Sequence, residues 1–251
     1  MSIRTQRDKG VVRIQLDRPR GNILDAAMIA AIRAEIGGLT RAVGVKLIVF
    51  EGSGPEFSFG ASVEEHQAHM VRQMLGDFHA MFRELEALGV PTAAAVRGRC
   101  LGGGLELAAW CGRIVASPNA SFAVPEVRLG VFPPMGALAL AWRVGGPRAT
   151  EMIVTGGAIN ANEAERIGLV DELAQDPSAA VDEWYQTHLS QLSASSIRYA
   201  WRAARMPLID RLTNDLPRLE SIYLESLMQT HDAREGISAF IEKRAPHFIH
   251  R

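Results

Sequence analysis

The chain has 251 residues, of which 47% are hydrophobic and 22% are charged, a composition typical of a globular protein with a sizeable core. Its 27 basic and 28 acidic side chains leave a formal charge of −1. This balance argues against a nucleic-acid-binding protein that depends on a broad basic face, although a local basic patch for a phosphorylated ligand is compatible with it.

Cysteine content and hydropathy indicate the compartment. Cys100 and Cys111 are too few for a disulfide framework and form no C-x-x-C pair, which favours a reduced, cytoplasmic setting. No cluster of Cys and His suggests a metal site. We expect no secretory signal, and no membrane span either, because Gly, Pro or charge interrupts every apolar stretch before about 18 residues.

Hydrophobic periodicity divides the chain into two regions. In the first two thirds, strands alternate with helices, and Asp25 is a suitable N-cap for the first helix. We expect strands at 11–16, 46–51, 92–96, 114–116 and 121–124, and helices at 25–42, 64–88 and 105–110. From residue 160 helical periodicity dominates, with helices expected at 198–209, 216–229 and 232–243. A late amphipathic tail of this kind often docks on a neighbour, because it has little core of its own.

Three glycines stand at the start of the predicted helix in the segment GRCLGGGLEL, residues 98–107. The amides and the positive dipole end there can stabilise an oxyanion, such as a carbonyl that becomes an enolate. The segment is not a dinucleotide fingerprint, because position 107 is Leu, and not a P-loop, because no Lys-Ser/Thr pair follows. Glu106, in the first helical turn, is either a functional acid or a solvent-facing residue that the dipole favours.

Two further segments contain candidate functional residues. The small residues of FSFGAS, 57–62, let backbone N–H groups approach a ligand closely, although a tight strand-to-helix turn explains them equally well. Glu126 is the only charged residue between positions 120 and 127. An acid isolated in an apolar run is a candidate for a raised pKa and general acid–base chemistry, and an exposed loop acid is the alternative.

Taken together and in this order, these segments resemble the enoyl-CoA hydratase/isomerase (crotonase) superfamily. The likeness begins with RPRGNIL at 18–24, continues through F-S-x-G-A, G-x-x-x-G-G-G-x-E-L-A and P-E-x-x-x-G, and ends with FIEKR at 240–244. It implies an α/β fold in which residues 1–195 form a crotonase-like spiral of repeated ββα units. Residues 196–251 would then form a C-terminal helical region that trimerises the protein, giving a homotrimer or a homohexamer.

The resemblance also implies residue roles. The N–H groups of Ala61 and Gly103 correspond to an oxyanion hole for a thioester oxygen. Glu126 would transfer the proton at the substrate carbon, and Glu106 would orient and help deprotonate the water. Lys243 matches a residue near the adenosine phosphates of coenzyme A, commonly contributed by an adjoining subunit. The residues expected to contact an acyl-CoA substrate are Arg20, Asn22, Leu24, Phe59, Gly60, Ser62, His66, Gly102, Pro133 and Lys243.

The implied function is addition of water to the conjugated double bond of an unsaturated acyl-CoA thioester. No metal or redox cofactor is required, and coenzyme A is part of the substrate. The segment FSFGASVEEH, 57–66, resembles the corresponding segment of hydratases that act on cyclic dienoyl-CoA thioesters. Departures from the usual family pattern at Ser62, Arg97, Gly112 and Pro134 suggest a specialised substrate.

Other functions stay open at the level of sequence. A double-bond isomerase of the same family is the nearest, but isomerases often lack an acid at the position of Glu106, so its presence favours hydration. A non-catalytic RNA-binding relative is disfavoured by the retention of both acids and by the neutral overall charge. A structural subunit of a larger oxidation complex is the third alternative.

Overall fold

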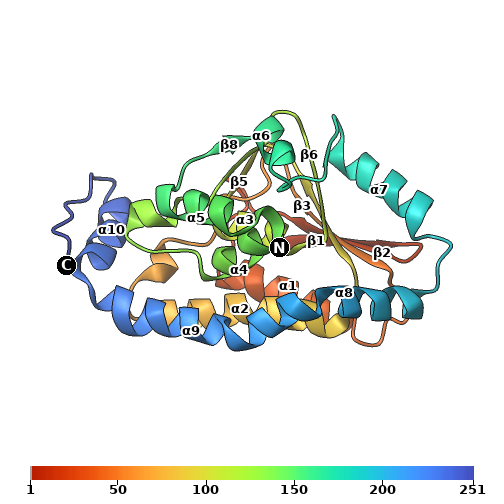
Figure 1. Cartoon of the computed structure of the whole chain (residues 1–251), viewed down its shortest axis with the longest axis horizontal. Coiled ribbons are helices and arrows are strands. Elements are labelled where there is room, and N and C mark those ends of the chain that lie inside the picture. The colour runs from red at the N-terminus through yellow and green to blue at the C-terminus, as the bar shows by residue number, and fades with distance from the viewer. Residues whose placement is uncertain (1) are drawn as a thin grey trace.

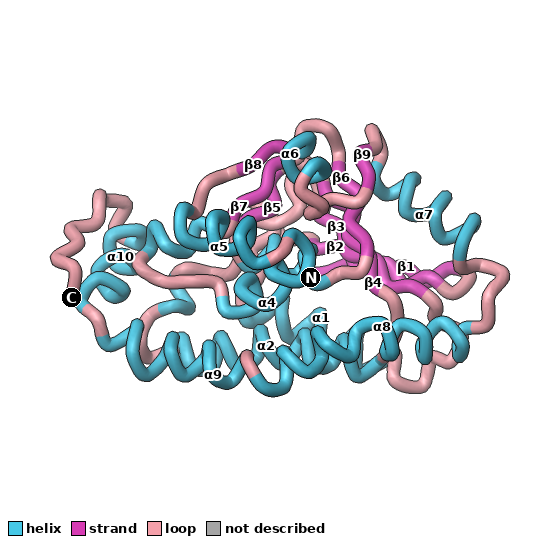
Figure 2. Tube along the Cα trace, in the orientation of Figure 1, coloured by secondary structure: helices cyan, strands magenta, loops and turns pink. Residues whose placement is uncertain are grey.

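The computed structural model describes residues 2–251 and has two β-sheets at its centre, surrounded by helices (Figures 1 and 2). Apart from the antiparallel pair β1 and β2, neighbouring strands of the larger sheet are parallel. This sheet has, in order, β1 (Ile3–Asp8), β2 (Val11–Leu16), β3 (Leu47–Gly52), β4 (Thr92–Val96), β6 (Arg113–Ala116) and β9 (Glu172–Leu173). The smaller sheet has β5 (Arg99–Leu101), β7 (Ser121–Ala123) and β8 (Ile159–Asn160).

Helices fill most of the remaining chain. Their bounds are α1 Ala26–Gly38, α2 Val71–Leu88, α3 Gly103–Trp110, α4 Pro134–Val144, α5 Gly146–Thr155, α6 Ala161–Arg166, α7 Pro177–His188, α8 Ala194–Asn214, α9 Leu216–Ser221 and α10 His231–Ile241. Three 3₁₀ turns are η1 Glu64–His66, η2 Pro125–Leu129 and η4 Leu227–Gln229, and η3, Ile222–Ser226, is a π-helical turn. Within residues 2–251, no helix is long and apolar enough to span a bilayer.

Each turn of the chain passes from a strand of the larger sheet to a short extended segment and then to a helix. Residues 58–61 follow β3, bridge to Leu24 on one side and to Cys100 of β5 on the other, and lead toward α2. Strand β5 follows β4, pairs with β7 and leads into α3. Because these segments run parallel, their carboxyl ends lie together, which places Ala61 beside Gly103. This succession is the expected spiral of ββα units.

The central strands are apolar on both faces, as is typical of parallel sheets covered by helices. Phe50 and Ala94 pack in the main core with α1 and α2. Val49 and Ala93 face the opposite way and contact Val181 of α7. Alternate side chains of β3 and β4 therefore pack into two apolar layers, one on each face of the sheet. These layers hold the ends of the strands that lead toward the helices in register.

Most expected elements form near their expected bounds, but strands β1, β5, β8 and β9 and helices α4 and α5 were not expected, and the helix expected at 216–229 is divided into α9, η3 and η4. The helix expected at 64–88 is divided into η1 and α2. Side chains compete with the helix for backbone carbonyls at the break, because the ring of His66 bonds to the carbonyl of Ser62 and the side-chain amide of Gln67 donates to the carbonyl of Glu64. Five of the six residues of β1 are exposed, so it lacks the alternation that identifies a half-buried strand.

The C-terminal region runs along α2 in its helices α8 and α9 and then turns to α10 at the far end of the molecule (Figure 1). Arg205 of α8 is buried, and its Nε lies 2.9 Å from Oε1 of Glu86 in α2. Its Nη2 donates to the carbonyl of Trp110, at the end of α3, over 3.0 Å. The guanidinium also stacks on the rings of Trp110 and Trp201. Arg205 therefore joins the C-terminal region to the two helices beside the glycine-rich segment.

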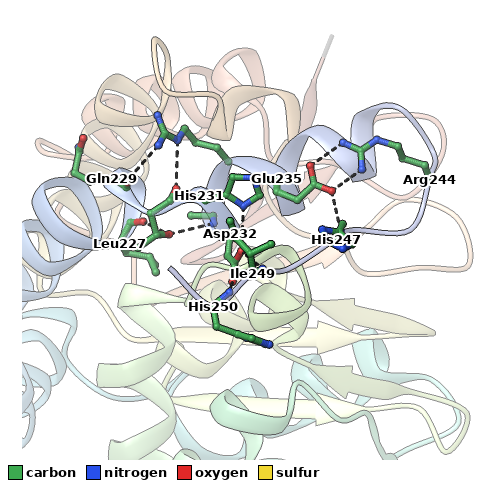
Figure 3. Close-up of polar contacts among 12 residues, drawn as sticks. Leu227, Gln229, His231, Asp232, Glu235, Arg244, His247, Ile249 and His250 are labelled. Atoms are coloured by element: carbon green, nitrogen blue, oxygen red, sulfur yellow. Dashed lines mark hydrogen bonds and ion pairs between the residues drawn. The ribbon is translucent and has the colours of Figure 1, made fainter.

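The last residues fold back onto α10 (Figure 3). Asp232 accepts a hydrogen bond of 2.8 Å from the backbone N–H of Ile249. Glu235 pairs with Arg244 over 2.5 Å and accepts a bond of 2.8 Å from the N–H of His247. These contacts fix the segment that follows α10. The boundary between 1–195 and 196–251, and the trimerising role of the second part, stay predictions.

We expect Arg205→Met to lower the free energy of unfolding by about 3–5 kcal/mol, because it leaves Glu86 as a buried, unpaired carboxylate. Urea unfolding followed by circular dichroism measures this. The double variant Arg205→Met/Glu86→Leu also removes the unpaired carboxylate and should recover most of the lost free energy of unfolding. A single variant with the wild-type unfolding midpoint would show that the ion pair does not hold α8 in place.

Candidate active site

A cavity of about 390 Å³ lies between the ends of the short strand segments and the C-terminal region. Most of the side chains around it are apolar, and its polar lining is limited to five residues: His66, Glu106, Glu126, Arg128 and Tyr223. The apolar part is Phe59, Gly60, Ala61, Val63, Met74, Leu75, Phe78, Leu101, Gly102, Gly103, Pro125, Leu129, Phe132, Pro133, Pro134 and Phe240. A few polar groups in an apolar enclosure are typical of a small-molecule site.

Two backbone amides meet at this cavity. A Cβ placed on Gly103 would lie 3.1 Å from the amide nitrogen of Ala61, and one placed on Gly60 would lie 3.1 Å from that of Gly103. Neither amide donates a hydrogen bond to another group within residues 2–251. Gly60 has φ +98° and its Cβ would meet the carbonyl of Leu101 at 2.8 Å, so only glycine permits this approach. The arrangement can bind a developing oxyanion.

Glu106 lies in the first turn of α3 with a side chain that is almost fully buried. Its Oε1 accepts a hydrogen bond of 2.6 Å from the N–H of Gly136, in the first turn of α4. Burial raises the pKa of Glu106 above the ordinary value for glutamate, while the N–H groups of Gly136 and Met135 act in the opposite direction by stabilising the ionised form.

Glu126 comes from η2, the 3₁₀ turn that follows β7. A Cβ on Gly102 would lie 2.7 Å from its Oε1, so the carboxyl group rests against the glycine backbone. Part of the residue is exposed, but its Oε2 is enclosed and has no hydrogen-bond partner among residues 2–251. Burial first, and then the negative charge of Glu106, raise the pKa of Glu126 well above its usual range.

The two carboxyl groups therefore have different surroundings. Glu106 has backbone donors that stabilise its charge, whereas Glu126 has an unpaired oxygen and a neighbouring negative charge. The pKa of Glu126 is raised by burial and by the charge of Glu106, whereas backbone N–H groups oppose the rise at Glu106, so Glu126 is the better proton donor and Glu106 the better base. The site thus offers one base and one acid.

The 3₁₀ turn that carries Glu126 is held by the C-terminal helix. A Cβ on Gly236 of α10 would lie 2.3 Å from the carbonyl oxygen of Leu129, and one on Gly130 would lie 2.6 Å from that of Asp232. Backbone packs directly on backbone at these points. The position of Glu126 therefore depends on α10.

His66 is buried in η1 and lines the cavity. Its Nδ1 lies 2.7 Å from the carbonyl oxygen of Ser62, and because a carbonyl only accepts, Nδ1 carries the proton. Burial lowers the pKa of His66, so the ring is neutral. Its Nε2 is then a hydrogen-bond acceptor.

Seven of the other residues expected to contact substrate fall into three groups. Phe59, Gly60, Gly102 and Pro133 line the cavity. Arg20 and Asn22 line an adjoining groove of about 430 Å³, which shares Phe59 with the cavity. Lys243 is exposed in the turn after α10 and lines neither space.

For three of the expected contact residues the structure gives the side chain another role. The amide of Asn22 donates to the carbonyls of Ser53, Glu56 and Phe57, and its oxygen accepts from Arg18. The side chain of Leu24 is fully enclosed in the core. The Oγ of Ser62 donates to Glu64 over 3.0 Å. These side chains shape the loops, and a contact between substrate and their backbone stays a prediction.

Sequence reasoning did not identify Tyr223 and Phe240 as cavity residues, nor Gly136 as a partner of Glu106. Tyr223 is nearly a hundred positions from Glu126 and lies in a tail read only as helical, so no local signal places it there. Within residues 2–251, no group of three or more His, Cys, Asp or Glu side chains could hold a metal ion.

Comparisons with known proteins show the family of the chain. The chain is 46% identical over 246 residues to cyclohexa-1,5-dienecarbonyl-CoA hydratase of Thauera aromatica, covering 98% of this chain and 95% of that protein. It is 32% identical over 253 residues to crotonyl-CoA hydratase of Syntrophomonas wolfei, covering 97% and 96%. Its fold is similar to an enoyl-CoA hydratase from Mycobacterium avium subsp. paratuberculosis, with a TM-score of 0.86, 26% identity, and 99% and 98% coverage. The model of the enoyl-CoA hydratase/isomerase family matches residues 6–251, and the chain therefore belongs to that family.

Proposed function

We propose that this protein is a hydro-lyase that adds water to the conjugated double bond of an unsaturated acyl-CoA thioester. The observation that carries the proposal is that Glu106, Glu126 and the unpaired amides of Ala61 and Gly103 all face one cavity. The resemblance to two named hydratases along nearly the whole chain supports it as well.

The chemistry follows from the positions of these groups. The amides of Ala61 and Gly103 bind the thioester oxygen, where negative charge collects as the enolate forms, and each such donor contributes about 3–4 kcal/mol in comparable sites. Glu106 accepts a proton from water while the water oxygen bonds to the electrophilic carbon of the double bond. Glu126 gives its proton to the α-carbon as the enolate collapses. The product is a hydroxyacyl-CoA, and proton exchange with solvent restores the two carboxyl groups.

We propose a cyclic dienoyl-CoA as the preferred substrate. The support is the 46% identity to cyclohexa-1,5-dienecarbonyl-CoA hydratase and the apolar cavity of about 390 Å³. The acyl group would lie among Met74, Phe78 and Phe132. Coenzyme A would extend past Phe59 into the groove that Arg20 lines. No further cofactor is proposed, because acid–base groups and an oxyanion site suffice for hydration.

We propose a homotrimer or homohexamer in the cytoplasm. Exposed apolar side chains of the C-terminal region, at Tyr199, Met206 and Ile222, support assembly through residues 196–251. Lys243, which lines neither the cavity nor the groove within one chain, would then reach a neighbour's coenzyme A. The two free, buried cysteines support a reduced compartment.

We expect Glu106→Gln and Glu126→Gln each to lower kcat by about 10²–10⁴-fold, because each removes one proton-transfer group. The double variant should be scarcely slower than either single one, since the two acids act as a unit. Hydration of crotonyl-CoA and of cyclohexa-1,5-dienecarbonyl-CoA is measured by chromatography of the hydroxyacyl-CoA product.

Glu51→Gln is the matched control, because Glu51 is buried but bonds to Arg13 and Ser178 outside the cavity. It should lower stability without lowering kcat. Full turnover in both active-site variants would exclude the two-acid mechanism. A wild-type protein that moves the double bond without adding water would be an isomerase instead.

We expect kcat/KM to follow a bell-shaped dependence on pH with both limbs above about 4.3, the ordinary pKa of glutamate. Activity should fall on acidification through the raised pKa of Glu106, as the base becomes protonated. It should fall on alkalinisation through the still higher pKa of Glu126, as the acid is lost. Steady-state rates in constant ionic strength test this, and a flat profile from about pH 5 to about pH 9 would contradict it.

A further inference from the structure

Tyr223 has a buried hydroxyl group without a protein partner. Its side chain has 0% exposure, and its Oη has no hydrogen-bond partner among residues 2–251. Buried tyrosine hydroxyls are ordinarily paired. Tyr185, the other buried tyrosine, follows that rule, because its hydroxyl donates to the carbonyl of Lys9. The unpaired hydroxyl of Tyr223 therefore indicates a partner that enters from outside the chain.

The phenol lies at the same cavity as the two acids. Tyr223 lines that cavity, and its ring packs against Phe132 with centroids 5.3 Å apart. Burial, and then the charges of Glu126 and Glu106, raise the pKa of Tyr223, which places the hydroxyl in the electrostatic field of both carboxyl groups and keeps it protonated. It is therefore available as a hydrogen-bond donor rather than as a base.

The unpaired Oη of Tyr223 matches a second unpaired atom on the same cavity, the Oε2 of Glu126. The two do not bond to each other. A water oxygen, or the hydroxyl oxygen that it becomes, can contact both, because such an oxygen accepts from a phenol and also donates to a carboxyl oxygen.

The local backbone directs the tyrosine toward the cavity. Tyr223 stands in η3, the π-helical turn between α9 and η4. An inserted residue of this kind changes the direction of side chains in a helix and is frequent at functional sites.

We propose that Tyr223 is a further catalytic residue, whose hydroxyl donates a hydrogen bond to the nucleophilic water and, after the reaction, to the new hydroxyl group of the product. This inference rests on the proposed hydratase function. Glu106 takes one hydrogen of the water and Tyr223 occupies one lone pair, so the remaining lone pair points to the substrate carbon. The phenol keeps its proton throughout, and the proton balance of the reaction is unchanged.

The test is Tyr223→Phe, which keeps the ring against Phe132 and removes only the hydroxyl. We expect kcat/KM to fall about ten- to hundred-fold, with affinity for the hydroxyacyl-CoA product weakened about tenfold. Affinity for the saturated acyl-CoA without the hydroxyl should be unchanged. The melting temperature should not fall, because the hydroxyl has no protein partner to lose.

Tyr185→Phe is the matched control, since Tyr185 is buried, bonds to Lys9 and lies outside the cavity. It should show the reverse pattern, with a lower melting temperature and unchanged turnover. Wild-type rates and product affinity in Tyr223→Phe would overturn this inference but not the proposed function. An equal loss of affinity for the hydroxyacyl-CoA product and for the saturated acyl-CoA would do the same. A wild-type protein that hydrates no unsaturated acyl-CoA would overturn the proposed function and the inference with it.

Discussion

The site depends on two carboxyl groups enclosed in one apolar cavity. Burial penalises the charged form of both groups, and the negative charge of Glu106 raises the pKa of Glu126 further. The two groups differ in their hydrogen bonds, since Glu106 accepts one from an N–H at the start of α4, whereas the Oε2 of Glu126 accepts none from the described residues. In the proposed hydration, that inequality suits Glu106 to act as the base and Glu126 as the acid.

Close backbone approach is the second requirement. The amides of Ala61 and Gly103 are neighbours only because two parallel segments end together and Gly60 lets the chain pass within reach of Leu101. A side chain at Gly102 would collide with the carboxyl group of Glu126. The glycine-rich segment therefore serves the site by the absence of side chains, and the helix that follows contributes its first-turn acid.

The C-terminal region completes the site as well as covering it. Arg205 attaches α8 to α2 and α3, α10 packs against the turn that carries Glu126, and η3 brings Tyr223 to the cavity. A boundary near residue 195 separates the spiral from the helical tail along the sequence, but the cavity belongs to both. Packing therefore links the tail to the residues that line the cavity.

The sequence by itself determined the family and much of the alternation of strands and helices, and it singled out the two glutamates that line the cavity, because these depend on short patterns: periodic apolar residues, glycines before a helix, and an isolated charge. It did not determine β1, whose exposed residues carry no alternation, or the break between η1 and α2. Nor did it distinguish Asn22 and Leu24, whose side chains hold a loop and fill the core, from Phe59, which lines the cavity. Only the tertiary structure decided that Gly136 supports Glu106 and that Tyr223 faces the acids. Contacts between residues so distant in the chain are set by how helices pack, and no local pattern encodes them.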